Sequence, residues 1–319
     1  MSKLVCMGEL LIDFQSKGTG ALKDTDEFVK KAGGAPANVC VQAKRLGFDC
    51  MYLSQVGGDS FGEFLIDTLN SEGIDTRFVL KNGNYDTSLA FVSFGAGGER
   101  QFAFYRRTAA DLYFTPEQFK AVELCEGDVF EFGSVALSTK ESRAAHDYVI
   151  DKAHGAGAIV CFDPNLRFNL WEDRDELKSV VHEYAKKADV IKVGDDELTF
   201  LTGVSDTDAA VKAFLGYGVK MIAVTRGAHG AKLYLSDGRT FDCAGFKVKA
   251  VDTTGAGDSF FGGLIAELMR LKMRKDTIVG AFDYDGILEF ACKCGSYTTT
   301  GYGAIAAMGN RKKISEVGK

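Results

Sequence analysis

The chain has 319 residues, of which 46% are hydrophobic and 26% are charged, and its formal net charge is −6. These values fit a globular protein with a large core, built as one α/β domain with a small appendage or as two domains. The acidic balance gives no sign of a nucleic-acid partner, and no apolar run approaches the length of a membrane span. The eight cysteines are scattered without a Cys-x-x-Cys pair, which predicts reduced thiols in the cytoplasm.

The N-terminal part of the chain begins with a short apolar strand, Leu4–Met7, and Asp13 follows it. A carboxylate directly after a strand of an α/β sheet lies where ligands usually bind, although a role in a turn is about as likely. The pair Gly33-Gly34 then leads into a predicted helix, because Pro36 suits a first turn. Two adjacent glycines also permit a close approach of the backbone to a ligand.

Two strand-like runs, Thr87–Phe94 and Arg100–Arg106, show alternating apolar residues and are joined by the glycine-rich residues 95–99. This pattern predicts a β-hairpin. Both of its faces carry apolar side chains, so the hairpin must bury them outside the main core, and pairing with a second copy of the chain is favoured.

From Asp128 onward, predicted strands and helices alternate, which indicates a parallel sheet with helices on its faces. The chain has no Walker P-loop and no dinucleotide-binding Gly-x-Gly-x-x-Gly motif. Asp163, Asn165 and Arg167 stand at alternate positions after a strand, which places three polar groups on one side of an extended segment. The alternative is a capped loop with an ordinary surface arginine.

The segment 251–265 contains the most informative motif of the chain. Gly255, Ala256 and Gly257 precede an apolar run with helical spacing, so the first amides of a helix are open to an anion there. We call these amides the anion seat. Asp258 lies within it and could be an N-cap residue or a catalytic carboxylate. Asp252 and Thr254 add oxygen ligands for a cation just upstream. The layout suits phosphoryl transfer, in which amides hold the phosphate and the carboxylate takes a hydroxyl proton.

The heptapeptide Asp-Thr-Thr-Gly-Ala-Gly-Asp at 252–258 resembles the signature of the ribokinase-like (PfkB) carbohydrate kinases, and further motifs follow in family order from Gly8 to Ile305. The resemblance implies an α/β fold with a doubly wound, mostly parallel sheet flanked by helices. It further implies a single domain over residues 1–319, with a small β lid formed by segments at about 13–32 and 86–108. In the family such lids often pair, so a homodimer through the lid is expected.

The strings Phe104-Tyr105-Arg106 and Asp-Pro-Asn-Leu-Arg at 163–167 are similar to those of the fructokinase branch. The expected activity is therefore ATP-dependent phosphorylation of a sugar hydroxyl, most simply fructose to fructose 6-phosphate. The alternatives are 2-keto-3-deoxygluconate kinase, ribokinase, and a non-catalytic sugar-binding protein on the same fold.

The resemblance also assigns roles to individual residues. Asp258 would be the catalytic base, with Arg167 and the amides of Gly255, Ala256 and Gly257 offsetting developing charge. Glu197 would order Mg²⁺ through water, although Gly194 replaces the usual Asn or Ser of that motif, and K⁺ would lie near Asp252 and Thr254. The expected sugar ligands, besides Asp258, are Asp13, Gly33, Gly34, Asn38, Phe104, Arg106 and Asn165. The expected nucleotide ligands are Lys192, Thr225, Gly227, Gly230, Gly255 and Gly257.

Overall fold

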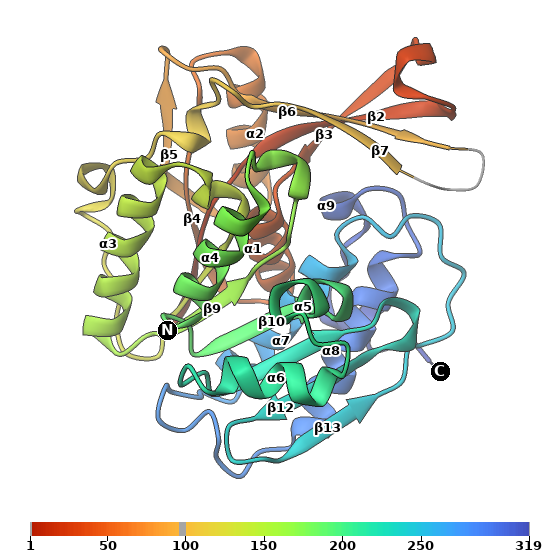
Figure 1. Ribbon diagram of the computed structural model, residues 1–319. Helices are drawn as coiled ribbons and strands as arrows, with labels where there is room; N and C mark the ends of the chain where they lie inside the picture. Colours follow the sequence, from red (N-terminus) through yellow and green to blue (C-terminus); the bar gives the residue numbers. More distant parts are fainter. Residues whose placement is uncertain (1, 96–99, 319) are drawn as a thin grey trace.

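The computed structural model describes residues 2–95 and 100–318 (Figure 1). Its strands are β1 (Lys3–Met7), β2 (Leu11–Thr19), β3 (Phe28–Gly33), β4 (Asp49–Gly57), β5 (Asp75–Asn82), β6 (Ser88–Phe94), β7 (Arg100–Tyr105), β8 (Val129–Gly133), β9 (Ile159–Asp163), β10 (Val190–Gly194), β11 (Met221–Thr225), β12 (Ala231–Leu235) and β13 (Thr240–Cys243). Its α-helices are α1 (Ala35–Arg45), α2 (Ser60–Ser71), α3 (Lys140–Ala156), α4 (Arg174–Ala185), α5 (Asp195–Thr202), α6 (Thr207–Leu215), α7 (Ala256–Arg270), α8 (Tyr284–Thr298), α9 (Ala304–Ala307) and α10 (Arg311–Ile314).

The main sheet has nine strands in the order β13-β12-β11-β10-β9-β8-β1-β4-β5. The seven strands from β11 to β5 pair in parallel, and only β12 and β13 pair antiparallel. Parallel sheets are covered on both faces, so their strands are apolar on both sides. In β1, Leu4 and Cys6 face one hydrophobic core, and Val5 and Met7 face the other.

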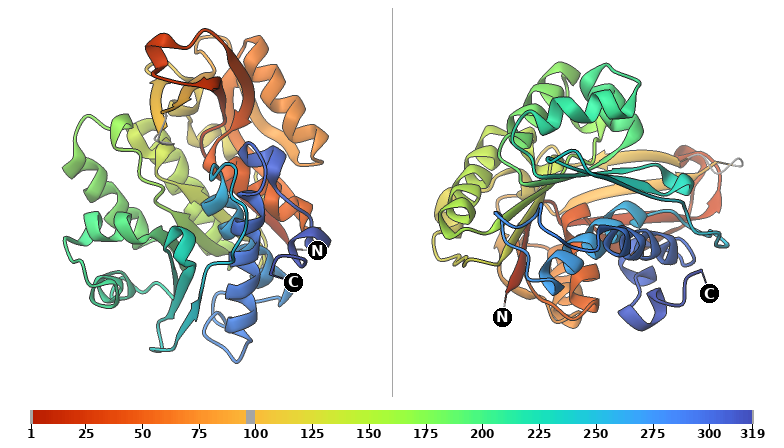
Figure 2. Two further views of the ribbon diagram at one scale, coloured as in Figure 1. Left: turned by 90° about the vertical axis from the view of Figure 1, so that its right-hand side faces the viewer. Right: turned by 90° about the horizontal axis from the view of Figure 1, so that it is seen from below.

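Helices cover both faces of this sheet (Figure 2). Helices α3–α6 pack on one face, and α1, α2, α7 and α8 supply the core of the other. The mixed α/β architecture with a large, mostly parallel sheet is the one expected from the sequence. No helix among the described residues is long and apolar enough to cross a membrane.

A second sheet of four strands, in the order β3-β2-β6-β7, projects from the main body at the top of Figure 1. Strands β6 and β7 form the antiparallel hairpin that the alternation predicts, and residues 96–99 of the predicted connection at 95–99 lie outside the described residues. The sequence predicted that Asp13 follows the first strand of the main sheet directly, and this prediction is wrong. It lies within β2, opposite Lys31 of β3 and Ala90 of β6, because the chain leaves β1 at Gly8 and at once starts the smaller sheet.

The order of the strands fixes where a ligand can bind. After β1 the chain adds β4 and β5 on one side, and it then returns to add β8, β9, β10 and β11 on the other. Ligands of open α/β sheets bind at the carboxyl ends of the strands where the winding direction reverses. Here that point lies between β1 and β8, facing the smaller sheet.

Candidate active site

Helix α7 opens at Ala256, and Gly255 immediately before it has a left-handed backbone with φ 75°. A β-carbon at residue 255 would lie 2.5 Å from the β-carbon of Ala304, so only glycine fits this turn. Asp258 lies in the first turn, but it does not cap the helix. Its Oδ2 instead accepts a hydrogen bond of 2.7 Å from Nδ2 of Asn38 in α1. The capping alternative for Asp258 is therefore excluded, which leaves its carboxylate available for chemistry.

A small cavity of about 210 Å³ lies between the smaller sheet and the carboxyl ends of the main sheet. It is smaller than the roughly 300–1,000 Å³ usual for drug-sized ligands, so it suits a small polar molecule. Its walls include most of the residues expected to bind sugar or to act in catalysis, namely Asp13, Gly34, Asn38, Phe104, Asn165, Arg167, Gly255, Gly257 and Asp258. Lys192, which was expected to bind the nucleotide, also lines this cavity.

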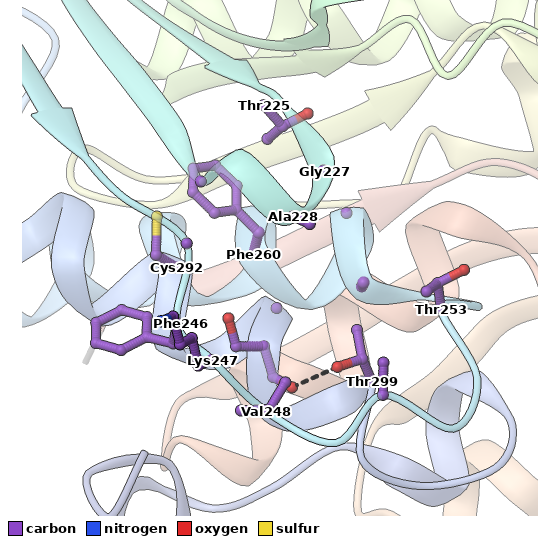
Figure 3. A pocket seen from close by; sticks show the side chains of 17 residues that line it. Thr225, Gly227, Ala228, Phe246, Lys247, Val248, Thr253, Phe260, Cys292 and Thr299 are labelled. Carbon is purple, nitrogen blue, oxygen red and sulfur yellow. Dashed lines mark hydrogen bonds between the residues drawn. The ribbon is translucent and has the colours of Figure 1, made fainter. Parts of the chain in front are cut away.

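A larger cavity of about 540 Å³ lies on the other side of the α7 N-terminus (Figure 3). Thr225, Gly227 and Gly230 line it, as do Ala256 and Phe260 of α7 and Cys292 and Thr299 from the region of α8. Thr253 and Gly257 line both cavities. The two cavities therefore meet at the first turn of α7, beside Asp258.

Lys192 stands at this junction. A β-carbon on Gly257 would lie 3.1 Å from its Nζ, so the ammonium is close to the backbone of the first turn of α7. Nζ also donates to Oδ2 and Oδ1 of Asp163 at 2.9 and 3.2 Å, within a buried ion pair. Burial by itself would lower the pKa of Lys192, but Asp163, Glu197 and Asp258 outweigh this effect and raise it. The cation is therefore held permanently charged where a phosphate group can approach it.

Two of the carboxylates that line the small cavity, Asp258 and Asp13, have raised pKa values. Burial raises the pKa of Asp258, and Lys192, the hydrogen bond from Asn38 and Arg167 offset part of this effect. Burial likewise raises the pKa of Asp13 to about 7, and Arg167 opposes it while Asp258 adds to it. A carboxylate with a raised pKa is a stronger base, which suits the removal of a hydroxyl proton near neutral pH.

The residues expected to hold cations form separate groups. Glu197 accepts backbone N–H bonds at both oxygens, from Leu166 at 2.6 Å and from Gly194 at 2.8 Å. Asp252 accepts from the amide and hydroxyl of Thr254 at Oδ1 and from the amide of Gly303 at Oδ2. Among the described residues there is no cluster of three His, Cys, Asp or Glu side chains able to hold a metal alone.

Two expected sugar ligands do not line the small cavity. Arg106 is buried and donates to Oδ2 of Asp111 at 2.6 Å and to the hydroxyl of Ser88 at 3.0 Å, so it supports the base of the smaller sheet. Gly33 lies behind Asp13, and a β-carbon there would collide with the Asp13 carboxylate. The segment 163–167 is also not fully extended, since Asn165 has φ 40°. Asparagine tolerates this left-handed conformation, which turns the chain toward the cavity.

Some residues of the site have no clear signal in the sequence. Glu9 lines the small cavity, where its Oε1 accepts from the Ala35 amide and burial raises its pKa to about 7. Asp163 was visible only as part of a polar pattern, and its partner Lys192 is 29 positions away. The irregular segment at 245–248 forms one wall of the large cavity, and irregular backbone leaves no periodic pattern to detect.

The family model for the pfkB family of carbohydrate kinases matches residues 1–311. A fructokinase-2 of Solanum lycopersicum is 38% identical over 307 residues, which cover 96% of this chain and 92% of that protein.

Solved structures are similar over the whole length. A fructokinase with bound ATP from Xylella fastidiosa has a TM-score of 0.89 at 30% identity, covering 98% of this chain and 97% of its own. A double-mutant fructokinase from Vibrio cholerae O395, bound to fructose, ADP and potassium, has a TM-score of 0.87 at 30% identity, covering 100% and 99%. The chain belongs to the pfkB family of carbohydrate kinases, the enzymes that transfer a phosphoryl group to a sugar hydroxyl.

Proposed function

We propose that this kinase phosphorylates fructose with ATP, with the sugar in the small cavity and the nucleotide in the large one. The single observation that carries the proposal is the position of Asp258 where the two cavities meet, in the first turn of α7. Fructokinases are among the similar proteins, and one similar structure contains fructose together with ADP.

In this mechanism, Asp258 accepts the proton of the sugar hydroxyl as its oxygen attacks the terminal phosphorus. Asn38 holds the carboxylate in position through the 2.7 Å hydrogen bond. The amides of Gly255, Ala256 and Gly257, together with Lys192 and Arg167, stabilise the charge that develops on the transferred group. Asp13 and Asn165 bind and orient the sugar from the opposite wall.

A magnesium ion, when bound with ATP, neutralises phosphate charge during transfer. Among the described residues no cluster of side chains could hold the ion alone, which fits an ion held mainly by phosphates and water, the usual mode for Mg²⁺ in kinases. Because both Glu197 oxygens already accept backbone amides, Glu197 would act on the ion through water. We also place a K⁺ ion near Asp252 and Thr254, supported by the potassium in a similar fructokinase structure.

The smaller sheet serves as a lid over the sugar, and two lids pair in a homodimer. In support, β7 is an edge strand whose Tyr105 is 66% exposed. Closing the lid would exclude water and limit the hydrolysis of ATP. We place the protein in the cytoplasm, which fits its eight free thiols.

Sugar-dependent consumption of ATP tests the proposal. The panel contains fructose, ribose and 2-keto-3-deoxygluconate at equal concentrations, with ADP release as the readout. We expect the highest kcat/KM with fructose. A higher kcat/KM with 2-keto-3-deoxygluconate or with ribose would show that this sugar, and not fructose, is the substrate. The absence of sugar-dependent turnover would indicate a non-catalytic sugar-binding protein.

A further inference from the structure

Two cysteines on neighbouring elements lie at one end of the large cavity. Cys292, in α8, lines the cavity near Phe260 and Phe246 (Figure 3). Cys243 is the last residue of β13, and this strand packs against α8. Cys243 is partly exposed and packs against the same hydrophobic core that includes Cys292. The pair therefore connects the cavity wall with a side chain that a small solute can reach.

The two thiols belong to packed elements, β13 and α8, and they differ in acidity. The hydrogen bond from Cys292 lowers the pKa of Cys243, and burial only partly opposes this effect. The same interaction raises the pKa of Cys292, and burial raises it further. Since the thiolate is the reactive form of cysteine, Cys243 is the expected nucleophile. Cys292 is the expected resolving cysteine, which attacks Cys243 after Cys243 has been oxidised.

The other cysteines near this region are placed differently. Cys294 is only two residues from Cys292, but it is fully buried against α7, where a β-carbon on Gly263 would lie 2.5 Å from its sulfur. Cys125 is exposed and precedes β8, on another part of the surface. Exposure alone therefore distinguishes Cys125, whereas a thiol partner together with access distinguishes Cys243.

We propose that Cys243 and Cys292 form an oxidation-sensitive pair that a hydroperoxide converts into a disulfide, and that this disulfide weakens nucleotide binding. The second half of the proposal rests on the proposed position of the nucleotide in the large cavity. Hydrogen peroxide is the oxidant used as the probe.

The chemistry balances in two steps. The Cys243 thiolate attacks one peroxide oxygen, the O–O bond breaks, and after protonation one water leaves while the cysteine becomes a sulfenic acid. The Cys292 sulfur then attacks the Cys243 sulfur, the S–O bond breaks, and the hydroxyl leaves as a second water with the Cys292 proton. The two thiols lose two electrons and two hydrogens, and the peroxide is reduced to two waters.

The disulfide would change the large cavity because it would link two of its walls covalently. A disulfide fixes two sulfur atoms at about 2.05 Å and restricts their torsion. Cys292 belongs to the wall formed by α8, and Cys243 comes two residues before the segment Gly245, Phe246, Lys247 and Val248, which forms another wall. Joining the two sulfurs therefore fixes the spacing of both walls at the place where a base would insert.

The thiol chemistry is measured first, without any activity assay. The protein is treated with hydrogen peroxide, alkylated, digested with trypsin and analysed by mass spectrometry. Trypsin separates the two cysteines into the peptides 240–247 and 276–293 and leaves Cys294 in a third peptide, because Lys293 lies between Cys292 and Cys294. We expect a cross-link between the first two peptides that dithiothreitol removes. Cys243→Ser abolishes it, and the matched control Cys125→Ser forms it as the wild type does.

The second measurement is the KM for ATP before and after oxidation. We expect an increase of about tenfold in the wild type and in Cys125→Ser, none in Cys243→Ser, and full reversal by dithiothreitol. If Cys125 is oxidised while Cys243 and Cys292 remain separate thiols, the proposal is wrong. A disulfide that leaves the KM for ATP unchanged would overturn its effect on the nucleotide. In neither case does the result depend on which sugar the kinase prefers.

Discussion

At the scale of single residues, the site depends on how Arg167 acts on the carboxylates around it. Arg167 lowers the pKa of both Asp13 and Asp258, against the opposite effect of burial. Its guanidinium lines the cavity, where it can also offset charge on the transferred phosphoryl group. One side chain therefore sets both the ionisation of the base and the stability of the transition state.

We predict that Arg167→Gln lowers kcat by about 10²–10³, the usual cost of losing one group that stabilises developing charge. The pH profile of kcat/KM should change as well. The rate falls on the acid side when Asp258 becomes protonated, and removing Arg167 raises the pKa of this group, so the acid limb moves to higher pH. Arg167→Lys retains the charge and should move the limb less. An acid limb that stays at the wild-type pH in Arg167→Gln would contradict this account of the electrostatics.

The sequence was most informative where one short segment contains the chemistry. The order Gly255, Ala256, Gly257, Asp258 predicts an anion seat with a carboxylate, and the structure places these residues at the start of α7. It was less informative where a role depends on a distant partner. Arg106 was expected at the sugar, but it pairs with Asp111 and Ser88. Nothing in the local sequence distinguishes a buried ion pair from a ligand contact.

At the scale of elements, the smaller sheet contains a hairpin that the local sequence pattern predicts and a further strand pairing that it does not. Alternation predicted the β6–β7 hairpin, but the pairing of β2 with β6 joins segments about 75 residues apart and leaves no local pattern. The exposed Tyr105 side chain of β7 is a liability unless another surface covers it. A second copy of the chain is the cover that we propose.

We predict that Tyr105→Asp shifts the protein from dimer to monomer. A carboxylate in an apolar interface must lose its hydration without gaining a partner, so association should weaken by at least about tenfold, or about 1.4 kcal/mol. Sedimentation velocity over a range of concentrations measures the shift. Val204→Asp is the control, because Val204 is 39% exposed between α5 and α6, away from the smaller sheet. A wild-type protein that is already monomeric would refute the dimer.

At the scale of the whole molecule, the buried carboxyl groups that form the site reduce the stability of the fold. Burial raises the pKa of Glu9 and of Asp13 to about 7 and that of Asp163 to about 6, all above their ordinary values near 4. The native state therefore holds protons that the unfolded chain releases. The stability from these groups is present below about pH 4 and is lost as the pH rises to about 7. Function and stability conflict here, as is common in active sites.

Asp13→Asn tests this conflict. The amide remains neutral at every pH, so the variant should be more stable than the wild type at pH 8, by about 2 kcal/mol after allowing for water in the cavity. The difference should shrink at pH 5, where Asp13 of the wild type is protonated. Urea unfolding at both pH values provides the free energies. A difference that is the same at pH 5 and pH 8 would show that ionisation of Asp13 is not its source.

The central claim is that Asp258 acts as the base between the two cavities. The most direct test compares Asp258→Asn with the wild type in fructose binding, by calorimetry, and in turnover, by ADP release, with the surface variant Asp237→Asn as control. The account predicts a fructose affinity close to that of the wild type and a loss of about 10²–10⁴ in kcat for Asp258→Asn, with no change for Asp237→Asn. Unchanged turnover in Asp258→Asn would contradict the account.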